Sequence, residues 1–265
     1  MNTNLHRILL GLVLLAAQAS AGAANPQIED PELKACMERS LPQKAMTQKL
    51  TFSVFDGDEA IDSTSADLLW KRGEDGLSKV IVRVTDPADR AGIAVLALEK
   101  PKGDPEFNVY MPEQRKARRV AGRTIDASMF GTDFSYEDFS HFQGMTTEGG
   151  FKRLDNEQID GVENFVVEVL PASEGTKYSR IVTWVDKERC ALTRMSFFAK
   201  NGTPLKELEV PRDALKQMGD RWVPHKIVLQ DLKRGQRTEL VVKEIAIDPE
   251  LSDNTFSVTR FGAGK

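Results

Sequence analysis

Apolar and polar residues alternate along most of the chain, and this period of two is typical of half-buried β-strands. The alternation is clear over residues 49–54 and 79–84, while the run 93–98 is apolar on both faces and is expected in the centre of a sheet. Strand-like runs then follow at residues 165–170, 178–186, 191–200, 205–212, 222–231 and 238–247. Asn201-Gly202 and Arg234-Gly235 separate such runs where tight turns belong. We therefore expect about eleven strands in a meander, and because no helix of crossover length intervenes, the sheet is expected to be antiparallel.

Helical spacing occurs in two short segments. Between Pro31 and Pro42 the apolar residues recur at helical spacing, which predicts one amphipathic helix. Residues 121–150 are too rich in glycine for a regular strand, and Ser135 precedes a short acidic segment there as a helix N-cap would. We expect this segment to be a helical loop inserted between two runs of sheet.

The N-terminus has the pattern of an export signal. Arg7 precedes a short apolar run, and small residues that suit a cleavage site follow it. The run is too short to cross a hydrocarbon core of about 30 Å comfortably, so an uncleaved anchor is disfavoured. We expect a signal peptide over residues 1–21, a flexible tether over 22–30 and a single domain over 31–265.

The charge balance and the cysteine count limit the functions that the protein could have. The 265 residues include 36 basic and 40 acidic side chains, for a net charge of −4, and this balance offers no electrostatic footprint for nucleic acid. The chain contains two cysteines, Cys36 and Cys190. In an oxidising compartment they would form the one possible intrachain disulfide, worth up to roughly 5 kcal/mol; the alternative is two buried free thiols.

The sequence offers little evidence for a catalytic site. Beyond the signal peptide the chain has His141 and His225, and neither has a metal-ligand spacing. No nucleophile elbow, phosphate-binding loop or dinucleotide fingerprint occurs. We therefore expect no enzyme activity, no metal and no cofactor. Asp133, Glu137 and Asp138 could supply an acid and a base, but their spacing favours a capped helix on the surface.

The densest charge cluster is the basic run that follows Tyr110-Met111-Pro112. Its members are Arg115, Lys116, Arg118 and Arg119. The run could be a solvated strand end, or it could bind an anionic headgroup or an acidic partner. It could also pair with the acidic residues 133–138 and hold the inserted loop on the sheet.

This central block resembles the signature of the LolA-like outer membrane lipoprotein-sorting proteins. The resemblance rests on Tyr110, Pro112, Arg115, Arg118, Arg119, Phe130, Gly131, Asp133, Phe134, Tyr136, Glu137 and Asp138. It implies a mainly β, half-open and curved antiparallel barrel with a short N-terminal helix and an inserted helical loop. It also implies the periplasm of a Gram-negative bacterium, a lipid or lipoprotein cargo, and an inner-membrane exporter of the RND (MMPL-like) type as partner.

The expected function is therefore a periplasmic carrier that holds acyl chains in an apolar groove and delivers them towards the outer membrane, most simply as a monomer. The cargo stays open between a lipoprotein, a sterol, a hopanoid and a phospholipid. Alternation and bulk select the candidate groove residues Leu68, Trp70, Val82, Val95, Val167, Val182, Trp184, Met195 and Phe197. The alternative is a periplasmic sensor with the same fold. Such sensors usually carry a further C-terminal domain, and the last predicted strand here is followed by only a short segment.

Overall fold

The computed structural model describes residues 30–40, 42–145, 149–171 and 175–263. The expected signal peptide (1–21) and the tether up to residue 29 lie outside the described residues. Asp30 belongs to the start of the first helix, because its carboxylate accepts hydrogen bonds from the backbone N–H groups of Glu32 and Leu33. It also pairs with Arg153 at 2.9 Å.

The described chain is built mainly of strands, with two α-helices, α1 (Pro31–Ser40) and α2 (Tyr136–Phe142). Both were expected from the sequence. The strands are β1 (Ala45–Asp56), β2 (Glu59–Arg72), β3 (Ser78–Asp86), β4 (Ala94–Leu98), β5 (Glu106–Met111), β6 (Lys116–Val120), β7 (Gly149–Ile159), β8 (Val162–Pro171), β9 (Tyr178–Asp186), β10 (Ala191–Ala199), β11 (Pro204–Glu209), β12 (Leu215–Met218), β13 (Arg221–Pro224), β14 (Lys226–Asp231) and β15 (Gln236–Ile247). Five short 3-10 helices, η1 (Pro112–Gln114), η2 (Gly122–Asp126), η3 (Arg212–Ala214), η4 (Asp253–Phe256) and η5 (Phe261–Ala263), connect or follow them.

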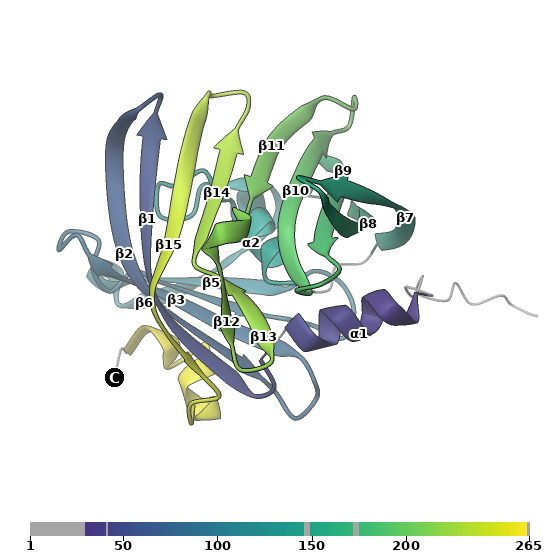
Figure 1. Ribbon diagram of the computed structural model, residues 1–265. Coiled ribbons are helices and arrows are strands. Elements are labelled where there is room, and N and C mark those ends of the chain that lie inside the picture. The colour runs from purple at the N-terminus through teal and green to yellow at the C-terminus, as the bar shows by residue number, and fades with distance from the viewer. Residues whose placement is uncertain (1–29, 41, 146–148, 172–174, 264–265) are drawn as a thin grey trace, which may run out of the picture.

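Thirteen of these strands form one antiparallel sheet, in the order β6-β5-β4-β3-β2-β1-β15-β14-β11-β10-β9-β8-β7. The first and last long strands, β1 and β15, pair in the middle, so the two halves of the chain extend the sheet in opposite directions. The sheet curves strongly but does not close, because β6 and β7 stand at its two ends and are not paired with each other. Figure 1 shows α2 within this curve and α1 beside the β12–β13 hairpin. The predicted fold class, a half-open antiparallel barrel, is confirmed.

The structure has more strands than the eleven expected. Part of the difference comes from strands such as β2 and β7, which carry many polar side chains. Another part comes from residues 222–231, which were expected as one strand but divide between β13 and β14. Pro224 has no N–H to donate to a ladder, and the chain leaves the β12–β13 hairpin there and joins the main sheet.

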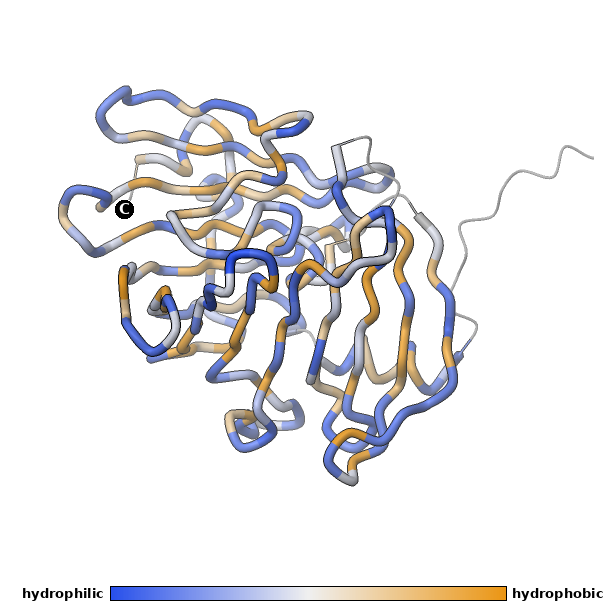
Figure 2. The backbone as a smooth tube through the Cα atoms, turned by 90° about the horizontal axis from the view of Figure 1, so that it is seen from above, coloured by the Kyte–Doolittle hydropathy of each residue, from blue (hydrophilic) through white to orange (hydrophobic). Residues whose placement is uncertain are grey.

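The main core lies on the concave side of the sheet. Leu50, Phe52 and Trp70 point into it and are at most 2% exposed, and Phe134 and Phe139 from the inserted loop pack against the same cluster. Figure 2 shows hydrophobic residues along the central parts of the strands and hydrophilic ones at the hairpin turns. The inserted segment therefore helps to fill the curve of the sheet.

Strand β4 is covered on both faces, which explains its continuous apolar run. Val95 faces the main core, whereas Ala94 and Leu96 face a second cluster formed with Phe256 and Phe261 of the C-terminal 3-10 helices. The expectation that this strand lies inside the sheet is correct, since β4 pairs with β3 and β5.

Candidate functional site

A cavity of about 1080 Å³ opens between α1, α2 and the concave face of the sheet. Its wall is mostly apolar. Among the lining residues are Met37, Met46, Leu50, Leu68, Phe139, Phe142, Met145, Phe151, Val167, Val169, Val185, Ala191, Leu192, Met195, Trp222, Ile227, Leu240, Val242 and Ile247. Small-molecule pockets range from about 300 to 1,000 Å³, so this cavity is slightly larger than the top of that range.

Three of the nine residues predicted to line a groove are part of this wall, namely Leu68, Val167 and Met195. The other six do not line the cavity. Trp70, Val82, Val95 and Phe197 are buried in the main core, at 1% exposure or less, and Val182 and Trp184 lie on the other face of β9.

The two residues of β9 illustrate why alternation chose the wrong face. Side chains of a strand point to opposite faces in turn, and in β9 it is Thr183 and Val185 that line the cavity. Trp184 instead donates a hydrogen bond from its indole nitrogen to Glu157 at 2.9 Å. Both faces of β9 carry bulky residues, so its sequence pattern alone does not show which face is concave.

Several cavity residues were not predicted from the sequence. Leu240 and Val242 of β15 alternate regularly and could have been found by the same rule as Leu68. Phe139 and Phe142 could not, because their place depends on how α2 docks inside the sheet.

Helix α2 is held in place by its own N-terminus. The hydroxyl of Ser135 accepts a hydrogen bond from the backbone N–H of Asp138, and the carboxylate of Asp138 accepts one from the backbone N–H of Ser135. This capping box confirms the predicted cap. The prediction of a surface helix is wrong, since Asp133, Glu137 and Asp138 are at most 4% exposed.

The burial of Asp138 is compensated by partners from the sheet. The ammonium of Lys206 lies 2.5 Å from its carboxylate and also donates to the backbone carbonyl of Asp133, while the hydroxyl of Tyr178 donates to Asp138 at 2.5 Å. Burial opposes the ionisation of Asp138, but the charge of Lys206 and these hydrogen bonds outweigh it and hold the pKa of Asp138 below its ordinary value. Burial, followed by the charge of Asp138, raises the pKa of Tyr178.

Asp133 is bound in a similar way. Its carboxylate accepts a hydrogen bond from the hydroxyl of Thr238 at 2.7 Å and pairs with the guanidinium of Arg234. Thr238 belongs to β15, and Arg234 to the turn between β14 and β15. The acidic residues of the inserted loop therefore serve as anchors to the sheet.

Glu137 and His141 form a third buried pair beside the cavity. The His141 ring lines the cavity, and its Nε2 lies 3.9 Å from the Glu137 carboxylate, with both side chains 5% exposed. Within the described chain, His141 Nε2 and Glu137 Oε2 have no hydrogen-bond partner. The described residues also hold no cluster of three or more His, Cys, Asp or Glu side chains suited to a metal ion.

The basic run does not pair with the acidic residues of the inserted loop, so that prediction is wrong. Arg115 ends η1, while Lys116, Arg118 and Arg119 point to solvent from β6. Arg119 lies 3.8 Å from Glu106 of the neighbouring strand. Asp133 and Asp138 have partners from β9, β11 and β15 instead, and Glu137 lies beside His141.

The remaining residues of the central motif form turns and aromatic contacts in and around the inserted loop. Tyr110 packs edge-on against Phe261, and a side-chain carbon at Gly262 would lie 2.3 Å from the Tyr110 ring, so only glycine fits there. Pro112 opens η1, and Phe130 and Gly131 both have positive φ in the turn before α2. Phe134 packs edge-on against Phe52, and Tyr136 against Phe107.

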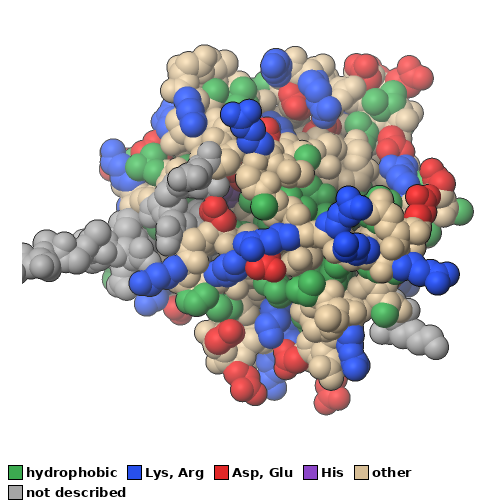
Figure 3. Space-filling model, turned by 180° about the vertical axis from the view of Figure 1, so that it is seen from behind, with side chains coloured by type: hydrophobic (Ala, Val, Ile, Leu, Met, Phe, Trp, Pro, Cys, Tyr) green, Lys and Arg blue, Asp and Glu red, His purple; other side chains and the backbone are tan. Residues whose placement is uncertain are grey.

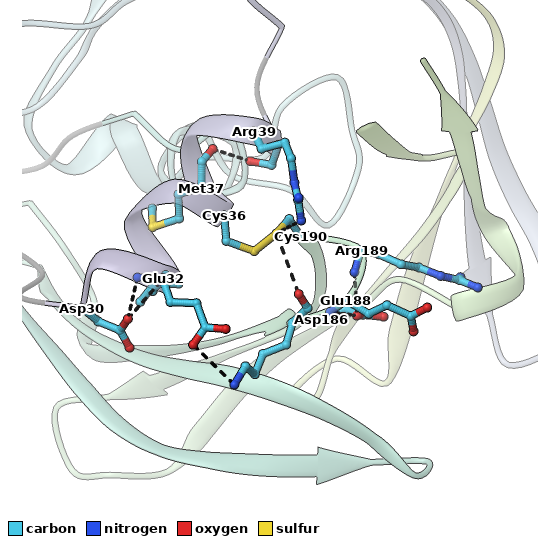
Figure 4. The surroundings of a disulfide bond; sticks show 12 residues. Asp30, Glu32, Cys36, Met37, Arg39, Asp186, Glu188, Arg189 and Cys190 are labelled. Carbon is cyan, nitrogen blue, oxygen red and sulfur yellow. Dashed lines mark hydrogen bonds and ion pairs between the residues drawn. A yellow bond between two sulfur atoms is a disulfide. The ribbon is translucent and has the colours of Figure 1, made fainter. Parts of the chain in front are cut away.

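The predicted disulfide between Cys36 and Cys190 is confirmed. It joins α1 to the turn between β9 and β10, with the two Cα atoms 5.0 Å apart and a sequence separation of 154. Arg39 donates a hydrogen bond to the sulfur of Cys190, and the carboxylate of Asp186 accepts hydrogen bonds from the backbone of this turn (Figure 4). Cys190 itself lines the cavity. The disulfide thus fixes α1 as part of the cavity wall.

Comparison with solved structures identifies the fold. A domain from Vibrio parahaemolyticus that is named for outer membrane lipoprotein sorting superimposes with a TM-score of 0.76 at 22% identity, covering 85% of this chain and 94% of that one. A DUF1329 family protein from Desulfovibrio piger gives the same TM-score and the same coverage at 23% identity. A LolA superfamily protein from Nitrosomonas europaea gives a TM-score of 0.65 at 20% identity, covering 85% of this chain and 96% of that one.

Sequence comparison adds a family assignment. The search of curated proteins finds no match. A family model described as an uncharacterized protein family matches residues 76–262, which is more than half of the chain. No described helix is both long and apolar enough to cross a membrane. The chain therefore belongs to this uncharacterized family and has the fold of the LolA-like lipoprotein-sorting proteins.

Proposed function

We propose that the protein is a periplasmic carrier that binds the acyl chains of a lipid or lipoprotein in its cavity and delivers them towards the outer membrane. The observation that carries this proposal is the apolar cavity of about 1080 Å³ between α1, α2 and the sheet. The solved structures with the same fold include a protein named for lipoprotein sorting, which is consistent with this role.

Hydrophobic burial explains why such a cargo needs a carrier. Transfer of an acyl chain from water is worth about 0.8 kcal/mol per methylene, or roughly 12 kcal/mol for a chain of about sixteen carbons. Spontaneous passage through an aqueous compartment is therefore slow. The cavity offers a comparable apolar environment from side chains such as Leu50, Met195 and Leu240.

The disulfide supports an exported location, because such bonds persist in oxidising compartments. The expected signal peptide agrees with this location. We further propose that the protein acts as a monomer, without enzyme activity, and receives its cargo from an RND-type inner-membrane exporter. That partner rests on the resemblance of the central motif.

Native mass spectrometry of the purified mature protein tests the carrier proposal. The delipidated protein is mixed with dioleoyl phosphatidylglycerol, and we expect a bound lipid at one copy per chain. A folded protein that takes up neither this lipid nor an acylated peptide would contradict the proposal.

Two neighbouring positions of β8 give a matched pair of variants. Val169 lines the cavity and Leu170, the next residue, is 43% exposed on the other face. Val169→Asp places a charge in the path of the acyl chains and should reduce uptake about tenfold or more, whereas Leu170→Asp should leave it unchanged. Equal uptake by the two variants would mean that the cavity is not the binding site.

A further inference from the structure

The charged side chains of the cavity wall are mostly basic. Lys34, Arg72, Lys102 and Arg221 line it, against a single acidic residue, Glu38. The whole chain, in contrast, has a net charge of −4. On the face seen in Figure 3, basic and acidic side chains are interspersed. The cavity therefore differs in sign from the molecule that surrounds it.

Two of the basic residues lie at the same end of the cavity. Arg72 is the last residue of β2, where it pairs with Ser78 of β3. Lys102 belongs to the loop between β4 and β5, and this loop starts beside Ser78, whose carbonyl accepts a hydrogen bond from the backbone N–H of Glu99. Lys102 is exposed and Arg72 is half-buried, so the positive charges stand where the apolar wall meets solvent, and we take this end as the mouth of the cavity.

The charges of Arg72 and Lys102 are not neutralised within the described chain. In the ranges that the structure describes, neither forms an ion pair with a carboxylate within 4 Å. Arg72 donates a hydrogen bond to the uncharged carbonyl of Gly76 at 3.5 Å and lies over the Trp70 ring at 5.6 Å. Lys34 is exposed on α1, one helical turn from Glu38, the acidic residue of the cavity wall. Arg221, in contrast, is 3.2 Å from Asp220. Arg72 and Lys102 are thus available to an anion from outside the chain.

We propose that the cavity selects lipids with an acidic headgroup, specifically glycerophospholipids whose phosphate carries a net negative charge. The phosphate lies between Arg72 and Lys102 at the mouth, and the acyl chains extend along Leu68 and Leu50 into the interior. A guanidinium can bind two phosphate oxygens at once, and the lysine adds a second cation. This inference rests on the proposed carrier function and names its cargo class.

Neutral lipids cannot form an ion pair with these two cations. A sterol, a hopanoid or a diacylglycerol would bury its apolar body in the same cavity but would leave Arg72 and Lys102 without a counter-charge. Among cargoes of similar apolar area, the protein should therefore bind those with an acidic headgroup more tightly than those without one.

The test compares two lipids with identical acyl chains. Uptake of dioleoyl phosphatidylglycerol and of dioleoylglycerol by the full mature protein is measured by native mass spectrometry and by displacement of a fluorescent fatty acid. We expect wild-type protein to prefer the phospholipid about tenfold, and the double variant Arg72→Gln, Lys102→Gln to lose this preference while it still binds dioleoylglycerol.

Lys243→Gln combined with Arg260→Gln is the matched control, because it removes one lysine and one arginine from exposed positions outside the cavity. The control should keep the preference, and glycerol 3-phosphate alone should not displace the fatty acid. If both lipids bind wild-type protein equally, or the Arg72 and Lys102 variant keeps the preference, the headgroup proposal fails while the carrier proposal stands. If neither lipid binds the folded wild-type protein, the carrier proposal fails with it.

Discussion

The ammonium of Lys206 lies 2.5 Å from the carboxylate of Asp138, and both side chains are excluded from solvent, at 5% and 0% exposure. The pair joins the N-terminus of α2 to β11. A charge in such an environment is stable only while its partner is present. The position of α2 on the sheet, and with it one wall of the cavity, therefore depends on this contact.

Removal of the lysine charge should destabilise the protein strongly. Lys206→Met leaves Asp138 as an uncompensated buried carboxylate, and we expect the free energy of unfolding to fall by about 3–5 kcal/mol. Urea unfolding followed by circular dichroism measures this change. The double variant Lys206→Met, Asp138→Asn should lose less than the sum of the two single variants, and strict additivity would argue against a coupled pair.

The same pair predicts loss of stability in acid. The pKa of Asp138 in the folded protein is below the ordinary value of 3.8, so as the pH falls the unfolded state binds a proton first. The contribution of the pair is fully present above this value and disappears as the pH falls through the lower folded pKa. The lowered pKa values of Asp30, Asp62 and Asp248 act in the same direction.

Unfolding free energies measured from about pH 6 down to about pH 2 should therefore decrease for the wild-type protein. Asp138→Asn, which has no carboxylate to protonate at this site, should show a smaller decrease. An identical pH dependence in the two proteins would remove Asp138 from the explanation.

The disulfide should contribute both stability and cavity shape. Cys36→Ser combined with Cys190→Ser is expected to lower the free energy of unfolding by about 2–5 kcal/mol, because the unfolded chain regains the freedom that the cross-link removes. It should also speed the release of bound lipid, since α1 is part of the cavity wall. Thermal unfolding and a lipid-release assay measure the two effects. Wild-type protein under reducing conditions is the control and should match the variant.

Substitution of Trp184 should affect stability but not lipid uptake. Because it lies on the outer face of β9, Trp184→Asp should leave lipid uptake unchanged and cost about 1 kcal/mol of stability through the lost contact with Glu157. Native mass spectrometry and urea unfolding provide the two measurements. A large loss of uptake at unchanged stability would place Trp184 in the groove after all.

The sequence predicted elements well where local patterns decide the outcome. The run 178–186 matches β9 in full, the helix expected before Pro42 is α1, and Ser135 caps α2 as expected. The cysteine pairing also followed from the count, once an exported location was assumed.

The candidate site was harder to predict, because it depends on contacts between distant segments. The burial of Asp138 requires Lys206, which lies 68 residues further along the chain. The cavity face of β9 depends on the direction in which the whole sheet curves, which residue alternation does not encode. A half-exposed cation such as Arg72 cannot be assigned to the cavity wall from the sequence, because its position depends on where the end of its strand lies in the folded sheet.

An open sheet leaves two edge strands whose backbone N–H and C=O groups could pair with another chain. Edge strands with this property promote aggregation unless charged side chains interrupt them. One edge, β6, carries the exposed residues Lys116, Arg118 and Arg119, and the other, β7, carries Lys152, Asp155 and Glu157. The basic run, which does not pair with the inserted loop, thus places like charges along one edge of the open sheet, where charged side chains disfavour pairing with a further strand.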